Sequence, residues 1–304
     1  AYLSAGELAS TGYAHLRRDV TVEPVAARPS SGRRTALAQW ITQEDNPLTT
    51  RVITNRIWQH HFGRGLVRTP NAFCHLGEPP THPELLDWLT TEFVARGWSF
   101  KAMHRLMMNT ATYRMASGHA DLAVAEKADP ENRLYWRAEV RRLAAEQIRD
   151  AALAVSGELD TAMGGPCVAA SKPRRSIYTL QKRNTQDAVL AAFDQPGGIK
   201  STAQRNVTTT ATQALLLING PWMLQRARAM GERVAAAGDD QAVVRTAYRQ
   251  ALGRAPDDDE VVEFLAFLDE QRARTGRTGQ EARTAAIADL CHVLLNSSGF
   301  LYVD

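Results

Sequence analysis

Residues 51–98 constrain the fold most, because a long polar loop lies there between two helical patterns. Apolar residues recur at helical spacing on both sides of the loop: Val52, Ile53 and Ile57 before it, and Leu85, Leu86, Leu89 and Phe93 after it. The second helix has two start signals, Pro83 at its first position and Glu84 directly after it. The loop has ~18 residues, which is long enough to expect a function of its own.

Helical patterns continue through the rest of the chain. One covers residues 143–155, and the sequence from Thr208 onward has helical spacing to its end. Residues 176–180 form the best strand candidate, which is typical of one half of a hairpin. We therefore predict a mainly α fold: a multi-helix globular domain with a small β element near residues 175–182.

The turn-forming residues indicate the domain organisation. Residues 23–32 are rich in proline, serine and glycine, so we expect residues 1–34 to be an N-terminal extension and linker. Residues 35–304 are enough to bury a full core, and we expect them to form a single helical domain. Its C-terminal part has two interpretations: it is continuous with the rest, or it is a helical subdomain of residues 208–304.

The charge balance gives no strongly basic surface. The chain has 36 Lys and Arg against 33 Asp and Glu, so we expect no nucleic-acid partner. Arginine supplies 31 of the basic residues and lysine 5. Its planar guanidinium suits carboxylate, sulfate or phosphate, although a GC-rich genome explains the same bias. No apolar run approaches ~18 residues, so we expect no membrane span.

Cysteine and histidine patterns indicate no cofactor and no metal. The three cysteines are Cys74, Cys167 and Cys291, and they form no CxxC or CxxCH motif, so covalent haem is not expected. Four histidines lie in or beside the loop: His60, His61, His75 and His82. They have no chelating spacing, and neighbours such as His60 and His61 point ~100° apart on a helix. We expect them to be hydrogen-bonded structural histidines.

One predicted helix carries two carboxylates a turn apart, Glu146 and Asp150. Side chains at positions i and i+4 lie ~5–6 Å apart. Like charges at that separation can split their pKa values, as acid–base catalysis requires. Glu146 and Asp150 are therefore the candidate catalytic residues. The structural alternative is that Arg142 and Arg149, within one turn of them, neutralise both.

Arginines on several segments are candidates for binding an anionic ligand, with aromatic side chains available to stack on a sugar. The predicted ligand-binding set is Asn55, Arg56, Trp58, Arg142, Arg149, Tyr178 and Arg205. Arg142, Glu146 and Arg149 occupy positions i, i+4 and i+7 of one helix and share a face. We expect that face to line an Arg-rich cleft with Arg56. A web of structural salt bridges is the alternative.

Several motifs follow one another in a specific order. They include Asn55-Arg56-Ile57-Trp58-Gln59, Phe62-Gly63-Arg64-Gly65-Leu66-Val67, His82-Pro83-Glu84-Leu85-Leu86-Asp87-Trp88-Leu89, Met163-Gly164-Gly165-Pro166, Arg205-Asn206-Val207-Thr208-Thr209 and Leu295-Asn296-Ser297. Through them the chain, from Arg33 onward, resembles the planctomycete-specific domain family, catalogued as domain of unknown function 1553. It departs from the family pattern at Ala72, Cys74 and Gly197, where Asp, Gly and Asp are usual.

The resemblance implies an exported bacterial protein, periplasmic or extracellular, in a genomic setting rich in sulfatases and polysaccharide degradation. It also implies upstream domains, often cytochrome-c-like, but no established activity. The leading interpretation is a module that binds anionic (sulfated or uronic) carbohydrate through the Arg-rich cleft. The alternatives are a glycan-active enzyme that uses Glu146 and Asp150 as acid and base, and a docking domain for an upstream electron-transfer domain.

Overall fold

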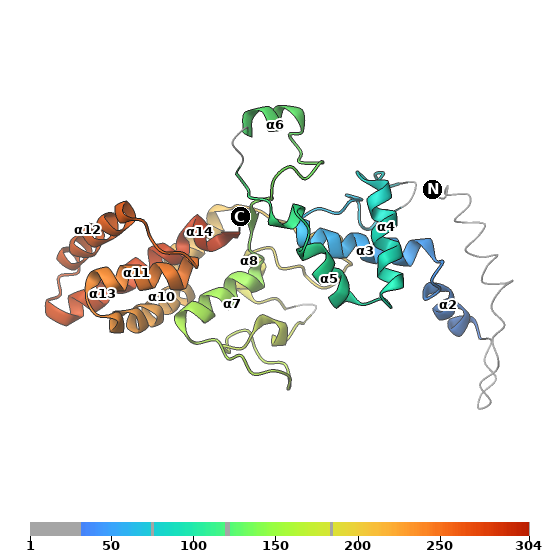
Figure 1. The fold of residues 1–304 in the computed structure, drawn as a ribbon. Helices are drawn as coiled ribbons and strands as arrows, with labels where there is room; N and C mark the ends of the chain where they lie inside the picture. Colours follow the sequence, from blue (N-terminus) through green and yellow to red (C-terminus); the bar gives the residue numbers. More distant parts are fainter. Residues whose placement is uncertain (1–31, 74–75, 119–121, 183–184, 304) are drawn as a thin grey trace. The chain divides into compact units, whose positions relative to one another are not determined.

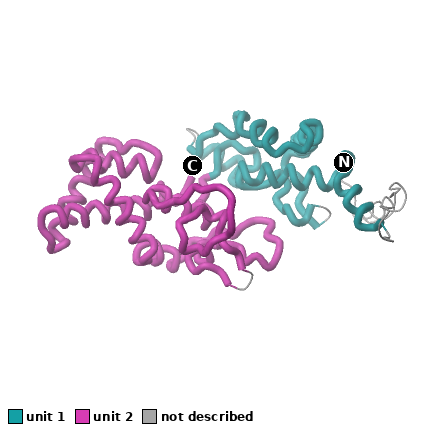
Figure 2. Tube along the Cα trace, turned by 90° about the horizontal axis from the view of Figure 1, so that it is seen from below, with its two compact units in different colours: residues 1–139, 304 teal, residues 140–303 magenta. Residues whose placement is uncertain are grey.

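The computed structural model describes residues 32–73, 76–118, 122–182 and 185–303 (Figure 1). The chain forms two compact units, residues 1–139 and residues 140–303, which Figure 2 colours separately. Helices dominate both units, so the predicted mainly α fold is confirmed. Within the described ranges no helix is long and apolar enough to cross a membrane. Cys74, His75 and nearly all of the expected extension of residues 1–34 lie outside those ranges.

The boundary between the two units lies at residues 139 and 140. The optional subdomain boundary that the sequence predicts, at residue 208, lies inside the second unit instead. The expected division into an N-terminal linker and a helical domain stays a prediction.

Unit 1 (residues 1–139) has a helical core. Its helices are α2 (Arg33–Ile41), α3 (Pro47–Phe62), α4 (Pro83–Ala95), α5 (Phe100–Met108) and α6 (Leu122–Ala128), with a 3-10 turn at Thr112–Arg114. α3 packs against α4 and α5, and Phe93, Met103 and Met107 are buried in this core. The side chain of Asn46 caps α3, and Pro47 occupies its first position.

One buried side chain holds the long loop of unit 1 to α3. The Asn55 amide donates to the Val67 carbonyl (3.0 Å) and accepts from the Val67 N–H (2.8 Å). Leu66 is fully buried, and its carbonyl accepts from the N–H of Thr81 at the far end of the loop. No side chain fits at Gly65, because its Cβ would lie 2.6 Å from the Asn55 amide nitrogen. The loop is therefore packed into the unit.

Unit 2 (residues 140–303) is a helical bundle whose two ends meet in a short strand pair. Its helices are α7 (Ala145–Ser156), α8 (Ala188–Ala192), α9 (Ala211–Asn219), α10 (Pro221–Val234), α11 (Asp240–Leu252), α12 (Asp258–Arg274), α13 (Gly279–Asn296) and α14 (Ser298–Leu301), with a 3-10 turn at Ala235–Ala237. α13 packs against α10, α11 and α12 and carries the buried Ile287, Leu290 and Leu294. β1 (Arg141–Arg142) pairs antiparallel with β2 (Tyr302–Val303).

The small β element lies in a different place from the predicted one. Where a strand was predicted, Ser176–Tyr178 forms a 3-10 turn. Isolated β-bridges lie around it: Asp160 with Arg174, Val168 with Thr179, and Lys182 with Thr185. The reason is that the Ser176 N–H and hydroxyl donate to Asp150, while the Ser176 carbonyl accepts from Thr179. These bonds turn the backbone and leave Ile177, a residue typical of strands, 75% exposed.

Two helices of unit 2 approach each other closely at Gly231 in α10. A Cβ there would lie 3.1 Å from the Ala288 Cα in α13. Gly231→Val should therefore push the helices apart and lower the free energy of unfolding by ~1–3 kcal/mol, measured by urea denaturation. Ala273→Val, at an exposed position of α12, controls for a β-branched residue in a helix. Equal urea midpoints for the two variants would contradict the packing argument.

The start of α12 predicts a loss of stability in acid. Asp257 and Glu260 form a capping box, and Arg254 donates two hydrogen bonds to the Glu260 carboxylate. The bond from Arg254 lowers the pKa of Glu260 from 4.5 to about 2. Because the folded-state pKa is the lower one, Glu260 contributes stability above the unfolded pKa, and this stability is lost as the pH falls toward about 2.

Glu260→Gln should remove that part of the acid-induced loss, measured as urea midpoints between neutral pH and the acid limit. Glu263→Gln, at an exposed position of the same helix, should leave the wild-type profile unchanged. A Glu260→Gln profile that coincides with the wild-type one would show that the contact with Arg254 adds no pH-dependent stability.

Candidate functional site

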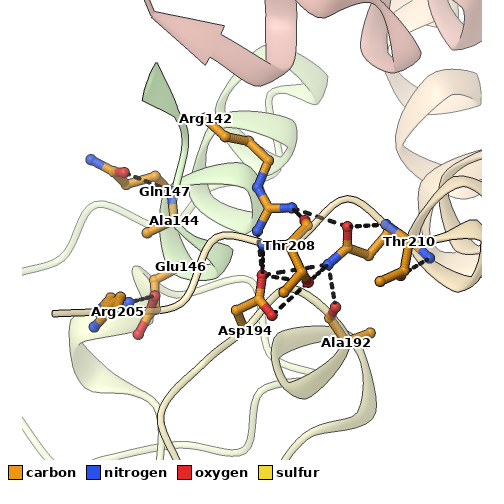
Figure 3. A network of polar contacts seen from close by, with 10 residues as sticks. Arg142, Ala144, Glu146, Gln147, Ala192, Asp194, Arg205, Thr208 and Thr210 are labelled. Carbon is orange, nitrogen blue, oxygen red and sulfur yellow. Dashed lines mark hydrogen bonds and ion pairs between the residues drawn. The ribbon is translucent and has the colours of Figure 1, made fainter. Parts of the chain in front are cut away.

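Six of the predicted site residues lie close together around the first turns of α7 in unit 2. They are Arg142, Glu146, Arg149, Asp150, Tyr178 and Arg205. Hydrogen bonds through Ser176, Asp194 and Thr208 connect most of them, and Figure 3 shows part of this network. We call this group the α7 cluster.

Arg149 is the buried centre of the α7 cluster, and its side chain is only 3% exposed. Its terminal nitrogens donate to the Ser176 hydroxyl and to Asp150 Oδ1, both at 3.1 Å. They also donate to three backbone carbonyls of one loop, those of Ala170 (2.7 Å), Lys172 (2.6 Å) and Arg174 (2.8 Å). Burial lowers the pKa of Arg149, and Asp150 acts in the opposite direction. Arg149 thus fastens the loop to α7, and this geometry favours an internal role over ligand contact.

Arg142 holds a second loop in place, the connection between α8 and α9 (Figure 3). Its guanidinium donates to Asp194 Oδ2 (2.6 Å), to Gln213 Oε1 (3.0 Å) and to the Thr208 carbonyl. Asp194 has a left-handed backbone (φ 66°), which is uncommon for a residue other than glycine. Burial alone would raise the pKa of Asp194, but hydrogen bonds from Thr208 and Arg142 outweigh it and lower that pKa. The network joins β1, the end of α8 and the start of α9.

Glu146 and Arg205 form the exposed edge of the α7 cluster. Arg205 Nη1 lies 2.5 Å from Glu146 Oε2, and the Arg205 side chain is 47% exposed. Burial raises the pKa of Glu146, but Arg205, the backbone N–H of Glu146 and Gln195 outweigh it and lower that pKa. Glu146 is therefore ionised at neutral pH, which suits an ion-pair partner or a base and not a proton donor.

Asp150 and Tyr178 contact the loop that Arg149 holds. Both Asp150 oxygens accept from the Ser176 N–H at 2.9 Å, and Oδ1 also accepts from the Ser176 hydroxyl at 2.6 Å. The Tyr178 hydroxyl accepts from the Gly164 N–H (2.9 Å). The Arg174 guanidinium lies 4.3 Å from the centre of the Tyr178 ring, so a cation covers one face of that ring.

The other three predicted ligand-binding residues belong to unit 1. Asn55 is fully buried in its bonds to Val67. Trp58 is 4% exposed, and its indole N–H donates to the Tyr135 hydroxyl (2.9 Å). Arg56 is half-buried and donates to the Asn71 side chain (2.9 Å). The predicted cleft that Arg56 shares with the α7 residues stays a prediction.

Unit 2 also contains a cleft that no sequence motif indicated. It has a volume of about 550 Å³ and lies between α10, α13 and the turn after α12. Charged residues of both signs line it: Arg228, Glu232, Arg277 and Asp289. Burial raises the pKa of Asp289, although His292 and Arg228 act in the opposite direction. These residues resemble an ordinary solvated helix face in the sequence, so spacing alone could not reveal the cleft.

Sequence reasoning also missed the residues that organise the α7 cluster, chiefly Asp194 and Ser176. One signal could have indicated Asp194: it lies in a turn-forming run, Phe193-Asp194-Gln195-Pro196-Gly197-Gly198, and a buried arginine needs a carboxylate or carbonyl partner. In unit 1 it missed His104, whose Nδ1 lies 2.8 Å from the Nε2 of His61. No local spacing relates two residues 43 positions apart.

Residues 33–268 match the model of a protein family described as PSD1, protein of unknown function (DUF1553). The chain belongs to the PSD1 family. This confirms the family that the motifs indicated. No curated protein and no solved structure matches the chain. Because the PSD1 description names no activity, function has to be inferred from the geometry of the side chains.

The contacts of Arg149 predict a large effect of a conservative change in this PSD1-family chain. Arg149→Lys keeps the charge, but one ammonium group cannot replace the planar guanidinium fork across three loop carbonyls. We expect a loss of ~3–5 kcal/mol in the free energy of unfolding, as for a broken buried charge network. Arg205→Lys, at the exposed edge, should change it by less than ~1 kcal/mol. Similar urea midpoints for the two variants would refute the role of Arg149.

Proposed function

We propose that the protein is an exported module that binds anionic carbohydrate, sulfated or uronic, at the exposed edge of the α7 cluster. Arg205 is the residue in direct contact with the acidic group of the sugar. The observation that carries this proposal is that Arg205 is half-exposed yet held in place by Glu146. A fixed, accessible guanidinium is the group that binds sulfate or carboxylate in a bidentate manner.

The remaining donors of Arg205 support this role. A guanidinium has five N–H groups, and the contact with Glu146 uses the nitrogen Nη1. Arg142 holds the neighbouring Thr208 carbonyl, so the segment that carries Arg205 is anchored close to it. In this proposal Arg142 and Arg149 are positioning residues, and the periplasm or the cell exterior is where the protein meets polysaccharide.

The α7 cluster gives less support to the glycan-active enzyme. An acid–base pair needs one carboxylate that stays protonated near neutral pH, whereas the pKa of Glu146 is lowered. Asp150 is occupied by Ser176. Docking to an upstream electron-transfer domain would need a broad charged surface, and no contact or cluster among the described residues of unit 2 points to one.

The proposal predicts opposite effects of two substitutions on the binding of sulfated and uronic oligosaccharides, measured by calorimetry. Arg205→Ala should weaken binding about tenfold or more, because a charged hydrogen bond contributes ~1.5–3 kcal/mol. Glu146→Gln should strengthen it, because a carboxylate beside the anion is removed while the hydrogen bond to Arg205 is kept. If Glu146 were a catalytic base, the same substitution would instead abolish cleavage of the oligosaccharide.

Two further variants locate the binding. Arg249→Ala, at an exposed position of α11, removes one positive charge elsewhere and should leave affinity unchanged. Arg228→Ala removes a charge from the cleft between α10 and α13. If Arg228→Ala weakens binding and Arg205→Ala does not, the sugar binds in that cleft and the proposed site is wrong. If the wild-type chain binds none of the oligosaccharides, the proposed function itself is wrong.

A further inference from the structure

Two histidines from different helices of unit 1 meet at its surface. His61 lies in the last turn of α3 and His104 lies in α5. The Nε2 atom of His61 is 2.8 Å from the Nδ1 atom of His104. Their ring centres are 5.0 Å apart, and the ring planes are inclined by 64°. Two imidazole nitrogens therefore face each other across a gap bridged by one hydrogen bond.

This arrangement is close to that of two imidazoles bound to one metal ion. Zinc–nitrogen bonds of ~2.0–2.1 Å at a tetrahedral angle place two ligand nitrogens ~3.3 Å apart and the ring centres ~5 Å apart. The observed ring centres already have that spacing, and the nitrogens need to separate by only ~0.5 Å. Each ring must also tilt by ~35° from the line that joins the two nitrogens, so that both lone pairs point at one ion.

The surroundings of the pair are compatible with a bound metal ion. His104 is exposed and His61 is half-exposed, so the pair lies at the surface of the unit. The rings of Tyr113 and Phe62 lie against His61, at 5.6 and 6.3 Å between ring centres. In the described part of the chain no group of three or more His, Cys, Asp or Glu is placed to hold a metal. A site made of two histidines would take its remaining ligands from water.

We propose that His61 and His104 form an exchangeable site for one divalent transition-metal ion, zinc or copper(II). Imidazole is a preferred ligand of both ions. In the bound state His61 Nε2 and His104 Nδ1 each donate a lone pair to the metal. The proton that they share in the hydrogen bond moves to the outer nitrogen of its ring through solvent, so both rings stay neutral. The ion then links α3 to α5.

Calorimetric titration of the tag-free full chain with zinc chloride and with copper(II) chloride tests this site. We expect saturable binding of one ion per chain and a rise in the unfolding temperature of the loaded protein. His104→Ala should weaken binding at least about tenfold, because one of the two protein ligands is lost. His104 is exposed, so this variant should unfold at the wild-type temperature without metal.

His60→Ala is the matched control, because His60 is exposed and adjacent to His61 but points ~100° away around the helix. It should retain the wild-type affinity and the metal-dependent rise in unfolding temperature. The proposal is overturned if neither metal binds saturably. It is equally overturned if His104→Ala binds as tightly as the wild type, or if His60→Ala loses as much affinity as His104→Ala.

Discussion

The buried guanidinium of Arg149 is the interaction on which the α7 cluster depends. A charge can be buried only where hydrogen bonds replace its hydration, and Arg149 obtains them from one loop and from Asp150. That loop, between α7 and the turn at Ser176–Tyr178, has no helix, and its only pairing between its own residues is the single β-bridge of Asp160 with Arg174. Three backbone carbonyls of the loop accept hydrogen bonds from the guanidinium. The Arg149 side chain therefore holds the loop in its conformation.

Arg174 binds backbone carbonyls of the same loop in the same way. Its terminal nitrogens donate to the carbonyls of Ala162, Gly164 and Pro166. The guanidinium also covers the ring of Tyr178. Two arginines thus organise a segment that the hydrophobic core alone would leave irregular. The exposed edge with Glu146 and Arg205 is positioned by this frame, because Ser176 connects the frame to the start of α7.

The helices were predictable because their start signals and apolar spacing involve residues that are close together in the sequence. α4 begins at Pro83, as the proline and Glu84 indicated, and its predicted apolar positions Leu86, Leu89 and Phe93 are buried. The helix predicted for residues 143–155 is α7, shifted by two residues at its start. The strand predicted near Ser176 failed because its hydrogen-bond partner, Asp150, lies 26 positions away. Local spacing carries no information about such a partner.

The candidate site was likewise predictable only where it depends on local spacing, and not where it depends on partners far away in the sequence. Helical spacing places Glu146 and Arg149 on neighbouring turns of α7, but the expectation that Arg142 lies on the same helix is wrong, because Arg142 is in β1. Spacing also does not say what covers that side of the helix. The type of residue does not predict its partner either. Trp58 suits stacking on a sugar ring, yet it is buried and its indole N–H donates to the Tyr135 hydroxyl. A side chain that can bind an external ligand can equally bind the protein's own backbone. Only the fold distinguishes these two uses.

This distinction bears on the excess of arginine over lysine. Several arginines donate to backbone carbonyls in loops or at helix ends: Arg142, Arg149, Arg174, Arg233 and Arg283. A guanidinium can serve several carbonyls in fixed directions, which an ammonium group does less well. Hydrogen bonds from arginine to the protein's own backbone therefore account for part of the excess of arginine over lysine. That part needs no external polyanion to explain it. Evidence for a ligand has to come from arginines that keep accessible donors after these internal bonds. By that criterion Arg205 is a better candidate than Arg142 or Arg149, although all three lie in the same cluster.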